Sequence, residues 1–231
     1  MDRGKSMLEE KLEEVKGKLL QSASLVERMI EKSIRGLTQR DEDILVEVIE
    51  KDEPRENELE LEIEETCIHV IARYQPQARD LRTIMMVSKM NNDLERMGDE
   101  AVNISESALF LIKKPEVKPL IDIPKMAEET KRMLKDSLSS FIDEDPQLAM
   151  SVCERDDIVD RLRDQILGEL VTFMASDPTT IERSNHLIRI SRSLERIADL
   201  STNISEDVIY MIEGKMIKHG GFENSKAAFE T

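Results

Sequence analysis

Apolar residues recur every three or four positions along most of this chain, which is the spacing of an amphipathic α-helix. The pattern is clearest near the end of each half, where narrow apolar seams run through Leu94 and Met97 and through Leu194 and Ile197. Prolines interrupt the pattern, because proline has no backbone N–H for the interior of a helix. Between the interruptions the periodicity predicts three helices in each half. These helices cover residues 5–39, 43–74, 77–112, 120–142, 146–175 and 179–214.

A proline-rich segment near the middle divides the predicted helices into two groups. Pro115 and Pro119 lie in a stretch that cannot continue a helix. Because three helices joined by short turns form an antiparallel bundle, we predict an all-α protein of two tandem, sequence-similar, antiparallel three-helix bundles. The first bundle, a linker, the second bundle and a flexible tail are predicted over residues 5–112, 113–119, 120–214 and 215–231.

The two halves repeat one sequence. Eight of the thirteen residues that start at Leu94 are identical to those that start at Leu194. A repeat of this length indicates two similar structural units docked against each other. An earlier match in the middle helices pairs Asp41, Leu45, Val48 and Asp52 with Asp145, Ala149, Val152 and Asp156.

Polar residues are repeated together with the apolar seam. Glu95, Asp99 and Asn103 are four residues apart, so at about 100° per residue they form one ridge that faces away from the core. The middle helix of each half adds carboxylates beside this ridge. The candidate ligands are Asp52, Glu56, Glu95, Asp99 and Asn103 in the first half, and Asp156, Asp160, Glu195, Asp199 and Asn203 in the second.

Two interpretations of these carboxylates are open. One is a solvated acidic surface, since the chain has 49 Asp and Glu residues to place. The other is a metal site in each half, because like charges four residues apart slightly destabilise a helix and their repetition needs a reason. Carboxylate and amide oxygens suit Mg²⁺, Mn²⁺, Ca²⁺ or iron, and bridging carboxylates allow more than one ion per site. A zinc site of cysteine and histidine ligands is disfavoured because these residues are not grouped.

Composition excludes several classes of function. The net charge is −16, whereas nucleic-acid binding relies on Lys and Arg, so no nucleic-acid partner is expected. No apolar run reaches the length of a membrane span, and no signal peptide is recognisable, so we expect a soluble cytoplasmic protein. The Glu-x-x-His motif of di-iron oxidases, catalytic triads and glycine-rich phosphate loops are all missing. Cys67 and Cys153 are expected to be inert thiols.

The repeated motif Leu-Glu-Arg-x-x-Asp-x-x-x-Asn-Ile resembles that of the PhoU family of phosphate-signalling proteins. The run from Gln75 to Arg82 and the Asp-Asp-x-x-Asp turn from Asp156 to Asp160 support the resemblance, which covers residues 8–212. It implies two similar three-helix bundles side by side. It also implies a negative regulator of phosphate uptake and starvation signalling, with the ATPase subunit of the phosphate ABC transporter and its sensor histidine kinase as partners, and a homodimer.

The resemblance further implies metal binding. PhoU proteins bind metal at pairs of Glu/Asp-x-x-x-Asp motifs, including multinuclear iron clusters on the bundle surface, so iron is the expected cofactor and Mg, Mn or Zn are alternatives. This chain departs from the family pattern where Pro54 intrudes and Glu56 replaces an Asp, so the two sites can differ. The leading hypothesis is a metal-binding regulatory adaptor that is not an enzyme. A carboxylate-bridged phosphatase or oxidase, and a metal-free helical scaffold, are the alternatives.

Overall fold

The computed structural model describes residues 7–213, which form helices joined by turns and one longer connection over residues 112–121 and contain no strand. None of the helices within these residues combines the length and the apolar character that a membrane span requires. The helices are α1 (Met7–Gln39), α2 (Glu42–Glu47), a π-helical turn η1 (Val48–Asp52), α3 (Glu53–Tyr74), α4 (Ala78–Leu111), α5 (Asp122–Asp143), α6 (Pro146–Ser176), a short 3₁₀ turn η2 (Pro178–Thr180) and α7 (Ile181–Glu213).

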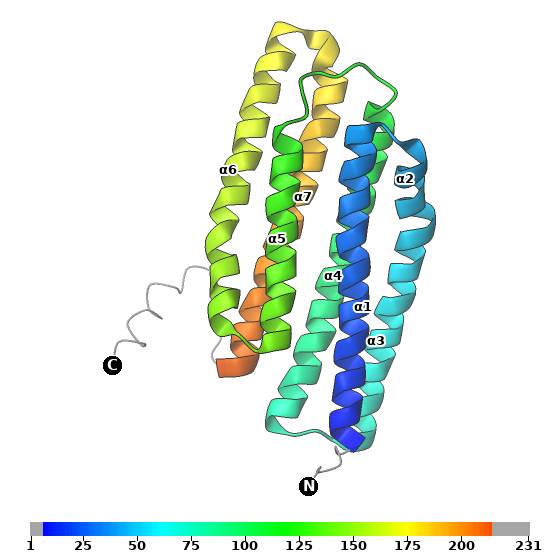
Figure 1. The fold of residues 1–231 in the computed structure, drawn as a ribbon, viewed down its shortest axis with the longest axis vertical. Helices are drawn as coiled ribbons and strands as arrows, with labels where there is room; N and C mark the ends of the chain where they lie inside the picture. Colours follow the sequence, from blue (N-terminus) through cyan, green and yellow to red (C-terminus); the bar gives the residue numbers. More distant parts are fainter. Residues whose placement is uncertain (1–6, 214–231) are drawn as a thin grey trace, which may run out of the picture.

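Two three-helix bundles stand side by side (Figure 1). The first contains α1, α3 and α4, and the second contains α5, α6 and α7. Helices α4 and α7 run antiparallel and pack against each other, and α1 also touches α5. The predicted all-α fold of two tandem bundles is therefore confirmed, whereas the division into separate units at residues 113–119 stays a prediction. The tail predicted over residues 215–231 lies outside the described residues.

Equivalent aspartates start the middle helix of each bundle. The Asp41 carboxylate accepts a hydrogen bond from the backbone N–H of Ile44, and the Asp145 carboxylate accepts hydrogen bonds from those of Gln147 and Leu148. Each aspartate thereby satisfies N–H groups that have no partner inside the helix. The repeat seen in the sequence at these positions is therefore a repeated N-terminal cap.

The middle helix of the first bundle differs from its prediction as one continuous helix over residues 43–74. The π-helical turn η1 interrupts it just before Pro54. Proline cannot donate to the carbonyl four residues earlier, and its ring would clash with that carbonyl in an α-helix. The wider π-turn adds one residue: the path from Val48 to Leu59 is one residue longer than that from Val152 to Leu162, although all four side chains are buried. Helix α6 is uninterrupted.

The apolar seams of α4 and α7 fill the bundle cores, as their periodicity predicts. Leu94, Met97 and Ala101 in α4, like Leu194 and Ile197 in α7, have fully buried side chains. The contact between the two helices, by contrast, contains buried charge.

Asp93 and Asp207 are each only 5% exposed, and Oδ2 of each has no hydrogen-bond partner among the described residues. Lys89 donates to Asp207 Oδ1 at 2.5 Å. Burial, followed by the charge of Asp207, raises the pKa of Asp93 to about 6.

Two glycines of α1 differ in the space around them, so substitutions there can test the packing of α1 against α2. A Cβ atom added at Gly36 would lie 2.5 Å from Cδ2 of Leu45, which is fully buried in α2, whereas nothing lies within 4 Å of one added at Gly17. We expect Gly36→Ala to lower the free energy of unfolding by about 1–3 kcal/mol through overpacking. Gly17→Ala should raise it by about 0.5–1 kcal/mol, because alanine is the better helix former. Urea unfolding of both variants measures this, and equal shifts would contradict the described α1–α2 packing.

Candidate functional site

The acidic ridge occupies the same place on both central helices. The ten residues from Asn91 show the same order of buried and exposed positions as the ten from Ser191. In each copy the glutamate is half-buried and the following aspartate is exposed, as seen at Glu95 and Asp99. The ridge thus lies at the edge of the bundle beside the middle helix, α3 in the first bundle and α6 in the second.

In the first bundle, carboxylates of α3 face those of α4. Partial burial raises the pKa of Glu95, and the charges of Asp99, Glu60 and Glu53 raise it further. Burial and the charge of Glu53 likewise raise the pKa of Asp99. Neither Glu95 nor Asp99 makes an ion pair or a side-chain hydrogen bond with another described residue. These four residues, Glu53, Glu60, Glu95 and Asp99, form what we call the first carboxylate cluster.

Asp52 lies apart from this cluster. Its carboxylate accepts a hydrogen bond at 2.7 Å from Lys32 of α1, and Lys32 also bonds Glu47 at 3.1 Å. The extra residue of the π-turn shifts the register of α3, so Glu53 and not Asp52 takes the position that Asp156 has in α6. Sequence comparison alone missed Glu53, although the unequal apolar spacing on either side of Pro54 carries the signal.

Glu56 is buried rather than part of an exposed ridge. Its side chain is 1% exposed and accepts a hydrogen bond from Ser22 Oγ at 2.9 Å. Burial, together with the charges of Glu95 and Glu60, raises the pKa of Glu56 to about 7. In the shifted register its counterpart is Val159, a core residue of α6. Glu56 is therefore a core carboxyl beneath the first cluster.

The register shift also changes which polar residues of α3 correspond to those of α6. Asn57 becomes the counterpart of Asp160, and its Nδ2 donates to Oε1 of Glu53 at 2.6 Å. Asn103 instead donates to Oε2 of Glu100 at 3.1 Å, toward the contact between the bundles. Asn203 is half-buried and makes no side-chain hydrogen bond to another described residue. The structure thus brings Asn57, which the sequence did not single out, to the first cluster.

The second bundle brings four predicted residues together. The charges of Asp156, Glu195 and Asp160 act on Asp199 and, with burial as the largest cause, raise its pKa to about 6. Burial and the charge of Asp160 also raise the pKa of Asp156. We call Asp156, Asp160, Glu195 and Asp199 the second carboxylate cluster.

One cation enters this second cluster. Nη1 of Arg163 lies 2.7 Å from Oε1 of Glu195 on α7 and 3.1 Å from Oδ1 of Asp160 on its own helix. The guanidinium therefore bridges carboxylates of two helices. A positively charged group is thus accommodated between the carboxylates of Asp160 and Glu195.

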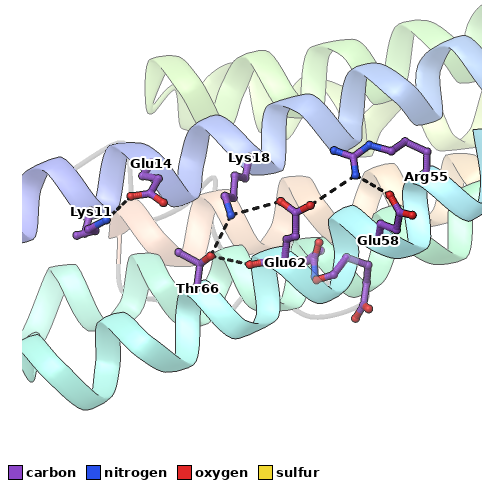
Figure 2. Close-up of polar contacts among 9 residues, drawn as sticks. Lys11, Glu14, Lys18, Arg55, Glu58, Glu62 and Thr66 are labelled. Atoms are coloured by element: carbon purple, nitrogen blue, oxygen red, sulfur yellow. Dashed lines mark hydrogen bonds and ion pairs between the residues drawn. The ribbon is translucent and has the colours of Figure 1, made fainter.

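Other acidic residues of α3 are neutralised by ordinary ion pairs (Figure 2). On the side that faces α1, Glu62 lies 3.4 Å from Lys18 and 3.5 Å from Arg55, and Arg55 also bonds Glu58 at 2.8 Å. The first carboxylate cluster, on the side that faces α4, has no such partners for Glu95 or Asp99. The two sides of one helix therefore differ in how their charge is compensated.

The side chains would have to rearrange to hold a metal ion. Within residues 7–213, no three His, Cys, Asp or Glu side chains already converge as the ligands of one ion do. The chemistry of the donors nevertheless fits a hard cation, because the first cluster supplies only oxygen ligands from adjacent helices. The thiols do not contribute, since burial raises the pKa of Cys67 to about 11 and that of Cys153 to about 12.

Paired three-helix bundles with an acidic ridge on each central helix place the chain in the class of all-α tandem-repeat proteins, and comparison with known proteins gives the family. Residues 19–108 and 123–208 each match the family profile of the PhoU domain. The chain therefore belongs to the PhoU family. This family consists of regulatory accessory proteins, which confirms that the chain is not an enzyme.

Similar proteins cover nearly the whole chain. The phosphate-specific transport system accessory protein PhoU homolog of Aquifex aeolicus is 44% identical over 208 residues, which are 90% of this chain and 94% of that protein. PhoU of Escherichia coli is 33% identical, over 93% of this chain and 89% of its own length. The crystal structure of PhoU from Pseudomonas aeruginosa aligns with a TM-score of 0.85 at 37% identity, covering 89% of this chain and 98% of that one.

The buried acid Glu56 makes a pH-dependent contribution to stability. Its pKa is about 7 in the folded protein, against 4.5 for an ordinary glutamate, so the stability that the neutral group contributes is lost as pH rises from about 4.5 to 7. Glu56→Gln keeps an acceptor for Ser22 and removes that charge. We expect this variant to exceed the free energy of unfolding of the wild type by less than about 1 kcal/mol at pH 5 and by about 1–3 kcal/mol at pH 8.

Urea unfolding in EDTA at the two pH values measures this difference. A wild-type stability that rises between pH 5 and pH 8 by an amount that Glu56→Gln abolishes would show that the charged carboxylate is the favoured form, contrary to its described burial.

Proposed function

We propose that this chain is a metal-binding regulatory adaptor of phosphate uptake. In this proposal it acts in the cytoplasm, as a homodimer, on the ATPase subunit of the phosphate ABC transporter and on the phosphate sensor histidine kinase, and it regulates both negatively. Support comes from its relatives, which are named phosphate-specific transport system accessory proteins, and from a PhoU of Streptococcus pneumoniae described as a phosphate transport system regulatory protein.

The observation that carries the metal part of the proposal is the uncompensated first carboxylate cluster. The charge of Asp99 raises the pKa of Glu95, the charge of Glu53 raises the pKa of both residues, and neither residue forms an ion pair with a described cation. A bound hard cation would remove this repulsion, and unfolded chains cannot preassemble the ligands. Glu53, Glu95 and Asp99 would hold the ion, with Glu60 and Asn57 beside it. Iron is the first candidate, and Mg, Mn or Zn are the alternatives.

The regulatory part follows from charge. The chain carries a net charge of −16, and complementary charge chiefly sets the rate and choice of association. A cation bound at a ridge neutralises carboxylates on a face that a partner can meet. Metal loading would then change how tightly the adaptor docks on a basic partner surface, with no chemical turnover.

The shifted register gives the metal proposal a matched pair of variants. We expect Glu53→Gln to weaken binding of Mn²⁺ or Fe²⁺ to the first cluster by about 10-fold or more, since one charged ligand is lost. Asp52→Asn, one residue earlier, should change it by less than about 2-fold, because Asp52 bonds Lys32 instead. Isothermal titration and elemental analysis of untagged protein purified without chelator measure both variants.

Two results would contradict the metal proposal. A larger loss in Asp52→Asn than in Glu53→Gln would place the ligands in the unshifted register. A wild type that carries no metal, and that melts identically with and without EDTA, would leave the acidic faces as the surface of a metal-free scaffold.

Partner binding is expected to depend on the ridge. The chain should bind the purified ATPase subunit or kinase with an affinity that falls as salt rises, because exposed charge pairs are screened over about 10 Å at 0.1 M. Charge reversal of Glu95 and Asp99 to Lys should change that affinity by about 10-fold or more. Reversal of Glu58 and Glu62, on the other side of α3 (Figure 2), is the control with the same change in net charge.

Pull-down and titration with each partner decide the adaptor hypothesis. Equal effects of the two reversals would show non-specific charge attraction. Absence of binding to both partners, together with turnover of a phosphate ester that the ridge variants abolish, would favour the metalloenzyme alternative.

A further inference from the structure

The two carboxylate clusters differ by one residue of opposite charge. Arg163 in α6 takes the position that Glu60 has in α3 when the buried residues of the two helices are aligned through Leu59 and Leu162. Each of these residues lies among the carboxylates of its own bundle. The first cluster therefore has an additional negative charge where the second has a positive one.

Arg163 is firmly engaged in the second cluster. Besides Glu195 and Asp160, its Nη2 lies 2.9 Å from Oδ1 of Asp164, and its side chain is 27% exposed. Guanidinium–carboxylate hydrogen bonds are among the strong ones, and arginine keeps its charge at every physiological pH. Deprotonation of Arg163 therefore cannot release Glu195 and Asp160 at any physiological pH.

From this arrangement we infer that Arg163 is a built-in competitor for metal in the second cluster. The inference rests on the proposed metal-binding function and adds an order of loading to it. A cation that binds Glu195 and Asp160 has to displace the guanidinium, whereas no residue has to leave Glu95 and Asp99. The first cluster is thus filled at low metal concentration and the second only at a higher one.

The structure also provides a place for the displaced side chain. An open groove of about 440 Å³ between α6 and α7 is lined by the carboxylates of Asp164 and Glu195 as well as by Arg163, Leu167, Ile188, Ser191, Arg192 and Arg196. Arg163 already lies along this groove, so a guanidinium that leaves Glu195 can keep its hydrogen bond to Asp164 and turn toward solvent. Filling the second cluster would then free Arg163 beside Arg192 and Arg196, which are already exposed, and make that face more basic. The first bundle cannot produce this change with Glu60.

Mn²⁺ titration of the full chain, followed by EPR of the free ion, tests the order of loading. We expect one tight and one weak class of site in the wild type, with the weak class at least about 10-fold weaker. Arg163→Gln should tighten the weak class by about 10-fold and leave the tight class unchanged. Arg192→Gln is the control, because Arg192 lines the same groove and makes no described contact with the carboxylates.

A second measurement follows the side chain directly. In NMR spectra the guanidinium N–H signal of Arg163 should move when Mg²⁺ fills the second cluster and stay still while only the first is filled. A Glu53→Gln, Asp99→Asn background removes the first cluster and isolates this transition.

The possible outcomes distinguish a failure of the proposed metal-binding function from a failure of the proposed role of Arg163. No Mn²⁺ binding in any form of the chain would overturn the proposed function. Two equal sites that Arg163→Gln leaves equal would overturn the role of Arg163 alone, and weaker binding in Arg163→Gln would show that Arg163 supports the site instead of competing for it.

Discussion

The antiparallel packing of α4 against α7 is the constraint on which the rest of the structure depends. Each helix turns its apolar seam into its own bundle and a second, polar face toward the other helix. With these two faces occupied, the ridge that begins at Glu95 or Glu195 has only the edge beside the middle helix left to occupy. Ser193 donates to Glu100 at 2.8 Å and Lys89 to Asp207 at 2.5 Å, so the contact is held by polar and charged groups. The position of both carboxylate clusters follows from this packing.

Helical periodicity was sufficient to predict most of the fold. The seams through Leu94 and Leu194 are buried as expected, and the helix ends lie within a few residues of their predicted positions. The ridge residues of α4 and α7 could also be predicted, because their spacing depends only on one helix. The alignment of the two middle helices could not be predicted by counting residues. A π-turn before Pro54 adds one residue, and this moved the site from Asp52 to Glu53.

Contacts between helices account for what the sequence did not reveal. The burial of Glu56 depends on Ser22 of α1, and the engagement of Arg163 depends on Glu195 of α7. Neither pair is close in the sequence. Neighbouring acidic residues of α3 also differ in surroundings because they face different helices. Glu62 lies beside Lys18 and Arg55, whereas Glu60 lies near the carboxylate of Glu95. Spacing alone therefore could not separate a solvated acidic surface from a cluster that lacks cations.

A duplicated bundle has thus acquired two unlike acidic faces. The first carries four carboxylates above a buried, protonatable Glu56, and the second carries four carboxylates, two of which are bridged by Arg163. Under the proposed metal binding, these unlike faces would provide two responses to one cation over two concentration ranges. The repeat preserves the place of each site, and single residues on α3 and α6 change its strength.

Anomalous diffraction from crystals of the chain soaked at low Mn²⁺ concentration tests the central claim most directly, because it locates each ion. The account predicts a strong peak between α3 and α4 that is coordinated by Glu53, Glu95 and Asp99, with no peak beside Arg163 at that concentration. A peak coordinated by Asp52, or peaks of equal height in both bundles with Arg163 still bonded to Glu195, would contradict it.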